Sequence, residues 1–208
     1  MRTIARSLLV CLTAILITAT AYSQTLPVSV GLKAGANLSN ISFEDYDDTE
    51  AKVGYQFGLD LKLNFLTTDF FVLTGFAFTN KGCKLEEIRG HDDLKIDATY
   101  LQIPVMAGYK VSVVDGININ FLFGPYFAHG IGGKVRDVNI YGRRDRYDTF
   151  GDDGVLKRFD MGFTGGVGID ISKLNFTLGY EFGITDNSQG RNSARNRNAF
   201  LTVGYYIF

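Results

Sequence analysis

The feature that most constrains the fold of this chain is the strict alternation of side chains in residues 53–65. Every odd-numbered residue there is apolar, and every even-numbered residue is polar or glycine. A period of two predicts a β-strand with one apolar and one polar face. At about 3.3 Å per residue, such a strand is roughly 43 Å long. Tilted by about 40°, it rises roughly 33 Å, which is enough to cross the apolar band of an outer membrane.

Seven other segments follow the same pattern, which predicts eight strands in all. The connections between them alternate between long and short, with both termini on the side of the short turns. This layout is typical of an all-β, eight-stranded antiparallel up-and-down transmembrane barrel with long outer loops and short periplasmic turns. The other predicted strands are residues 28–38, 70–81, 98–111, 117–128, 158–171, 174–185 and 198–208.

A soluble, lipocalin-like barrel is the structural alternative, and it differs in placing the apolar face inside around a ligand. Glycine is frequent on the polar face, which suits the crowded inside of a narrow barrel. The apolar face carries bulky residues in strand after strand, and the chain ends on an aromatic residue. We therefore expect the apolar face to contact outer-membrane lipid, with girdle aromatics that include Tyr55, Phe65, Tyr109, Phe121 and Phe159.

The N-terminal residues have the pattern of a secretory signal. Arg2 and Arg6 precede a short apolar run, and Ala21 and Ser23 supply the small residues of a cleavage site. We predict a cleaved signal peptide at residues 1–23 and one barrel domain at residues 24–208. A membrane anchor is the alternative, but the apolar run is short for a spanning helix.

Removal of that segment has two consequences for function. Cys83 is then the only cysteine, so an intramolecular disulfide is excluded. The remaining chain has 19 basic and 22 acidic residues, so no basic excess indicates a nucleic-acid partner.

The fourth predicted strand contains a motif that resembles a known family. Tyr100-Leu101-Gln102-Ile103-Pro104-Val105 is similar to the YLxIP signature of PorT-like outer-membrane β-barrels. The resemblance implies an eight-stranded outer-membrane barrel without assigned catalytic residues; the namesake of the family is linked to protein secretion. Other pieces match in order: residues 31–39, Lys81-Gly82, Gly124-Pro125-Tyr126, residues 159–162, residues 166–168 and residues 178–187.

Two prolines fit poorly with this fold, because proline removes a hydrogen bond from a strand ladder. Pro104 and Pro125 both fall inside predicted strands of a closed barrel. The resemblance implies that the family tolerates both prolines, and we expect β-bulges at these positions.

Eight charged residues are predicted to face the inside of the barrel. An eight-stranded barrel is just wide enough for its side chains to fill it. Four cations and four anions there suggest a packed polar plug of ion pairs. A small pore or proton path is the alternative. The residues are Lys33, Lys62, Lys81, Lys110, Asp60, Asp160, Asp170 and Glu181.

An enzyme would need a nucleophile, a base and an orienting group. The chain has only two histidines, His91 in the second long loop and His129 at the outer end of the fifth strand. His129 could be combined with Ser188 or Ser193 and with Glu181, but the spacing matches no motif. We therefore expect no enzymatic activity, no metal and no cofactor, with a lipid-modifying enzyme as an alternative. Cys83 has no partner that suggests a metal site.

The long insert at residues 129–157 is rich in arginine and tyrosine and also carries aspartates. Such a loop could bind a surface glycan, lipopolysaccharide phosphates or an envelope protein; the alternative is a solvated loop. The sequence thus predicts a monomeric outer-membrane barrel with a structural or interaction role at the cell surface. A narrow transport or secretion accessory is the other possibility.

Overall fold

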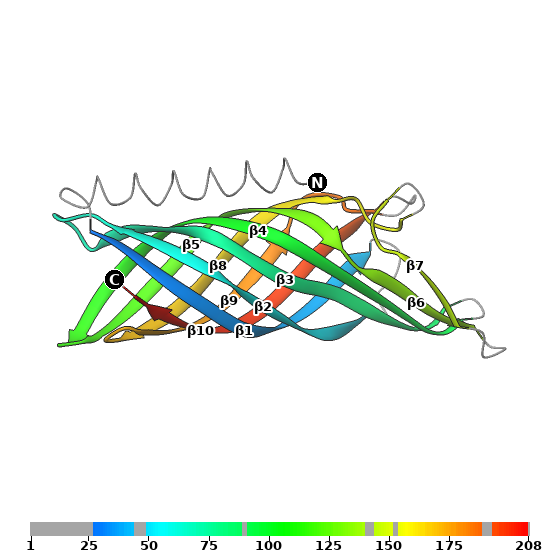
Figure 1. The fold of residues 1–208 in the computed structure, drawn as a ribbon, viewed down its shortest axis with the longest axis horizontal. Helices are drawn as coiled ribbons and strands as arrows, with labels where there is room; N and C mark the ends of the chain where they lie inside the picture. The colour runs from blue at the N-terminus through cyan, green and yellow to red at the C-terminus, as the bar shows by residue number, and fades with distance from the viewer. Residues whose placement is uncertain are drawn as a thin grey trace, which may run out of the picture.

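The computed structural model describes residues 27–43, 49–88, 91–139, 144–151, 154–188 and 193–207, and regular structure in them is entirely β (Figure 1). The predicted signal peptide lies outside these residues. None of the described residues belongs to a helix long and apolar enough to cross a membrane. The strands are β1 (Val28–Phe43), β2 (Thr49–Asn64), β3 (Phe70–Ile88), β4 (His91–Val114), β5 (Ile117–Gly132), β6 (Lys134–Asn139), β7 (Arg144–Asp148), β8 (Phe159–Ile171), β9 (Leu174–Gly183) and β10 (Ala194–Tyr206).

Eight of the described strands form a closed barrel. Their order around the wall is β3-β2-β1-β10-β9-β8-β5-β4, and pairing of β3 with β4 closes the ring. Every barrel pair is antiparallel. The predicted fold class is therefore confirmed. We call the end with the β2–β3, β4–β5 and β8–β9 connections the turn end, and the opposite end the loop end.

Alternation of side chains places the apolar face outside. In β5, Phe121 and Phe123 are exposed, whereas Leu122 between them is buried in the lumen. In β2, Tyr55 and Phe57 are exposed, while Gln56, Asp60 and Lys62 at even positions are buried. The five predicted girdle aromatics are all exposed. A lipocalin-like arrangement is thus excluded, because its apolar face would point inward.

The strands extend farther at the loop end than the sequence pattern predicts. The predicted loop at residues 82–97 consists mostly of strand, since β3 continues to Ile88 and β4 begins at His91. The predicted insert at residues 129–157 contains β6 and β7, and β6 pairs with the outer part of β4. Beyond the lipid, charged side chains can point to either face of the sheet. The backbone ladder can therefore continue past the point where the alternation of apolar and polar residues ends.

The expected bulges at the two prolines are absent from the described ladders. Neither Pro104 nor Pro125 lies at a register shift. Instead, each proline lies beside a gap in a ladder. The β3–β4 ladder has no paired residues between Thr74 and Ala77, and the β4–β5 ladder has none between Pro104 and Ala107. The Thr74 hydroxyl donates to the carbonyl of Pro104 over 2.8 Å. A local gap in the ladder therefore accommodates each missing N–H group.

Glycines inside the barrel make room for aromatic rings. A Cβ atom on Gly108 would lie 2.2 Å from the ring of Phe71, and one on Gly130 would lie 2.4 Å from the ring of Phe150. Both distances are far too short for carbon atoms in contact. The glycine content of the polar face thus follows from the narrowness of the lumen.

We expect an arginine on the lipid face to destabilise the barrel. Leu178, in the middle of β9, is 65% exposed. Leu178→Arg should lower the free energy of unfolding by about 2–4 kcal/mol, the cost of an arginine near the bilayer midplane. The measurement is urea unfolding of the protein in lipid vesicles. The control is Leu66→Arg in the turn after β2, which should change stability by about 0–1 kcal/mol. Equal effects of the two variants would contradict the assignment of the lipid face.

Candidate functional site

Two ion pairs span the lumen from one side of the barrel wall to the other. Lys81 of β3 contacts Glu181 of β9 at 2.7 Å, and Lys62 of β2 contacts Asp170 of β8 at 2.8 Å. In each pair both routes around the wall pass through three other strands, so the two partners lie on directly opposite sides of the barrel. The four residues are nearly fully buried. These pairs therefore cross the lumen at two levels.

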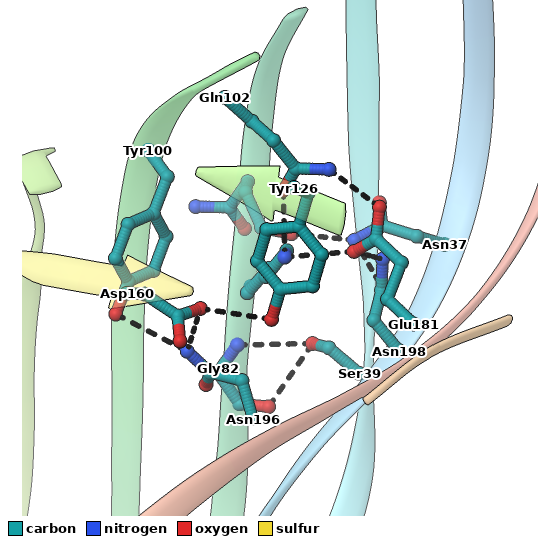
Figure 2. Close-up of polar contacts among 12 residues, drawn as sticks. Asn37, Ser39, Gly82, Tyr100, Gln102, Tyr126, Asp160, Glu181, Asn196 and Asn198 are labelled. Carbon is teal, nitrogen blue, oxygen red and sulfur yellow. Dashed lines mark hydrogen bonds and ion pairs between the residues drawn. The ribbon is translucent and has the colours of Figure 1, made fainter. Parts of the chain in front are cut away.

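Glu181 is the centre of the polar contacts at the level nearer the loop end (Figure 2). Its carboxylate accepts hydrogen bonds from the side-chain amides of Gln102 and Asn198 in addition to its contact with Lys81. Lys81 also donates to Gln102 and lies 4.6 Å from the centre of the Tyr126 ring. A buried charge is tolerated when its remaining hydrogen-bonding capacity is satisfied in this way.

Asp160 is the predicted interior anion that has no lysine partner among the described residues. It is fully buried, and its carboxylate accepts hydrogen bonds from the Tyr126 hydroxyl at 3.2 Å and from Asn196 at 2.8 Å (Figure 2). The Thr185 hydroxyl contacts its other oxygen at 3.0 Å. Neutral donors thus replace the cation that the sequence pattern suggested.

The remaining predicted cations and anions lie nearer the turn end. Lys33 contacts Asp60 at 2.6 Å, between the neighbouring strands β1 and β2. Lys110 is half-buried, and no ion pair joins it to another described residue. Lys110 lies near the turn end, whereas Asp160 lies near the loop end. The four predicted cations therefore do not pair one to one with the four predicted anions.

The sequence pattern missed one further interior pair. Lys52 of β2 contacts Asp97 of β4 at 2.6 Å, and Lys52 is buried. Both residues were assigned to loops. Lys52 does continue the even-numbered polar face of residues 53–65, so extending the alternation by one residue would have found it.

An apolar cap closes the lumen at the loop end. Phe150 packs edge-on against Tyr100 with 5.4 Å between ring centres, and Leu156 forms isolated bridges with Phe150 and Ser188. The buried Thr149 hydroxyl donates to the carbonyl of Asp97 at 2.6 Å. The cap belongs to a cluster of Ile41, Cys83, Ile96, Ala98, Tyr100, Tyr126, Ala128, Val135, Phe150, Leu156 and Ala194. The insert that the sequence presented as a charged loop therefore places apolar residues in the mouth of the barrel.

The strands β6 and β7 form a hairpin that extends from the wall at the loop end (Figure 1). Its exposed charges are partly compensated: Lys134 contacts Asp148 at 2.6 Å, and Arg136 lies 3.6 Å from Asp97. In the last loop, backbone N–H groups of Ala194 and Ser188 lower the pKa of the Asp186 carboxyl, and Lys157 lies 3.5 Å from it. The loop end thus presents mixed charge on an ordered β-hairpin.

The structure does not bring the hypothetical catalytic residues together. His129 is exposed on the outer face of β5, whereas Glu181 is buried in the lumen. His91 begins β4 rather than lying in a loop. Cys83 is a free, buried thiol in the apolar cluster. Among the described residues, no three histidine, cysteine, aspartate or glutamate side chains are placed to share a metal ion.

The YLQIP stretch has a physical role in this arrangement. Tyr100, Gln102 and Pro104 are buried, and the residues between them point outward. Tyr100 supports the cap, Gln102 contacts both Lys81 and Glu181, and Pro104 lies at the gap in the ladder. One short segment therefore contributes to the wall, the lumen and the cap.

We expect removal of one member of the Lys81–Glu181 pair to destabilise the barrel, because the partner charge stays buried. Lys81→Met and Glu181→Gln should each lower the free energy of unfolding by about 3–5 kcal/mol. The double variant should lose clearly less than the sum of the two losses. Urea unfolding in vesicles measures all three variants. The control is Lys134→Gln, which removes one member of an exposed ion pair and should change the free energy of unfolding by about 1 kcal/mol or less. Additive losses in the Lys81→Met, Glu181→Gln double variant would contradict the pairing.

Several solved structures of outer-membrane proteins are similar to this chain. Ail, the attachment invasion locus protein of Yersinia pestis, in complex with the heparin analogue sucrose octasulfate, is 17% identical, with a TM-score of 0.45 and coverage of 86% of this chain and 99% of that chain. Neisserial surface protein A is 12% identical, with a TM-score of 0.47 and coverage of 86% and 97%. The outer membrane enzyme PagL is 10% identical, with a TM-score of 0.45 and coverage of 82% and 98%. No curated protein matches the sequence.

A family model provides the assignment. The model described as "Outer membrane protein beta-barrel domain" matches residues 22–189, which is most of the chain. The match agrees with the closed barrel, its apolar exterior and its polar lumen. The chain therefore belongs to the outer membrane protein β-barrel domain family and is an integral outer-membrane barrel.

Proposed function

We propose that this barrel is a sealed, non-catalytic protein that binds an envelope protein through its loop end. The observation that carries the proposal is the contrast between the two parts of the molecule. Buried ion pairs and an apolar cap fill the lumen, whereas the β6–β7 hairpin holds polar side chains in a fixed position beyond the wall. A filled lumen favours the loop end as the surface that contacts an envelope protein.

The charges of the loop end favour a protein over a polyanionic glycan. Lys134 and Lys157 each contact an aspartate, and Arg136 lies near Asp97. A glycan rich in sulfate or phosphate would favour uncompensated cations, because those dominate its attraction. Mixed charge of both signs suits a complementary protein surface. A surface glycan is the second candidate, supported by the arginine content of the insert.

Three narrower assignments belong to the same proposal. The ordered motifs around residues 100–105 support placement among PorT-like barrels. The opposite faces of His129 and Glu181 support a non-catalytic barrel rather than a lipid-modifying enzyme. The basic start and small residues before Gln24 support cleavage of residues 1–23.

Site-specific crosslinking in intact outer membranes tests the partner. A photo-crosslinking residue in place of Arg136, which is half exposed on β6, should capture a reproducible protein. An affinity tag between β1 and β2 allows recovery without altering the hairpin. The matched control places the same crosslinker at Leu178 on the lipid face, where we expect no such capture. Recovery of the barrel alone at Arg136, or the same capture at both positions, would contradict the proposal.

Conductance in planar bilayers tests whether the lumen is sealed. The purified barrel should pass no steady current, because the Lys62–Asp170 and Lys81–Glu181 pairs cross the path of an ion. A stable single-channel conductance would instead favour the narrow transport or secretion accessory. A large-pore porin reconstituted in the same way is the positive control.

A further inference from the structure

The lumen opens at the turn end into a hollow of about 460 Å³, which we call the turn-end vestibule. Its lining includes Lys62, Lys110, Asn118, Asp170, Ser172 and Lys173. Its volume lies within the range of small-molecule sites. It lies at the end opposite to the loop-end surface proposed above.

Charge in the turn-end vestibule is unbalanced. Three lysines line it, and Asp170 is the only acidic residue of the described chain that does so. Asp170 already contacts Lys62 at 2.8 Å, and Asn175 donates to its other oxygen at 2.6 Å. The carboxylate is therefore engaged, and two ammonium groups, those of Lys110 and Lys173, are left without a carboxylate partner among the described residues.

The two remaining cations differ in setting. Lys173, in the β8–β9 turn, is exposed and donates to the carbonyl of Ile207 at 3.1 Å. Lys110 is half-buried on β4, and its ammonium group has no hydrogen-bond or ion-pair partner among the described residues. A partly desolvated ammonium without an anion is unfavourable, and a bound anion would relieve that cost. The surrounding low-dielectric wall strengthens the attraction.

Neutral donors complete the lining. The Ser112 hydroxyl donates to the amide oxygen of Asn118 at 2.8 Å, which leaves the NH₂ group of Asn118 available to a ligand. The Ser172 hydroxyl lies in the same lining. Lysine ammonium groups act on phosphate as point charges, and a phosphate has enough oxygens to accept from several donors at once. The lining therefore suits a compact oxyanion with several acceptor oxygens.

We propose that the turn-end vestibule is a binding site for a phosphate group, with Lys110 and Lys173 as its cationic ligands. Short turns of such barrels face the periplasm, so the ligand is a periplasmic phosphate or the phosphate of a lipid headgroup. Lys62 contributes less, because Asp170 neutralises it.

Titration with inorganic phosphate tests the site in the full-length mature barrel, refolded in a phosphate-free sugar detergent. Calorimetry should show saturable binding of one phosphate per barrel. Lys110→Gln should raise Kd by about tenfold or more, because it removes a charge-assisted contact. Lys173→Gln should also weaken binding. The matched control, Lys157→Gln, removes an exposed lysine at the loop end and should leave Kd unchanged.

A variant with the opposite sign separates a built site from general charge. Asp170→Asn removes the carboxylate that neutralises Lys62, so it should tighten phosphate binding. Heat-modifiable migration on gels confirms that each variant is folded, and Lys173→Gln in the exposed turn keeps the test available if Lys110→Gln does not fold. Non-saturable uptake, an unchanged Kd in the folded lysine variants, or an equal loss in Lys157→Gln would overturn the proposal.

The source of the phosphate is resolved by a second probe. Dihexanoyl phosphatidic acid carries the same phosphate on a short lipid. Tighter binding of this probe than of inorganic phosphate, with loss of both in Lys110→Gln, would identify a lipid headgroup as the ligand. Equal binding of the two probes would identify the free anion.

Discussion

The structure depends on the requirement that backbone N–H and C=O groups be paired inside lipid. An open sheet edge cannot exist in the hydrocarbon layer, so the sheet must close on itself. Here the first and last strands, β1 and β10, pair with each other, so the sheet has no free edge in the barrel wall. Closure with eight strands makes the lumen narrow. A narrow lumen forces the inward side chains into contact, and each buried charge then needs a partner.

This requirement explains the arrangement of the interior. Lysines on one side of the wall reach carboxylates on the other, and amides such as Gln102 and Asn198 satisfy the remaining oxygens. Where no cation of the described chain pairs with a carboxylate, as at Asp160, hydroxyl and amide groups fulfil the same need. The apolar cap then separates this polar interior from water at the loop end.

The barrel itself was predictable because lipid and lumen impose opposite demands on successive residues. That alternation located all eight wall strands and identified which face meets lipid. It could not identify the partners within the lumen, because Lys81 and Glu181 are brought together by the stagger of the whole barrel rather than by any local pattern. The β6–β7 hairpin was missed for a related reason: outside the membrane, Arg136 and Asp148 can sit on a strand without an apolar alternation.

The attachment of the hairpin has an evolutionary consequence. Because β6 pairs with the outer part of β4, the hairpin is held by backbone hydrogen bonds that do not depend on side-chain identity. An exposed position such as Lys134 can therefore change without disturbing the Lys81–Glu181 pair below. A barrel built in this way can diversify the surface that it displays to its surroundings while the membrane-spanning part stays the same.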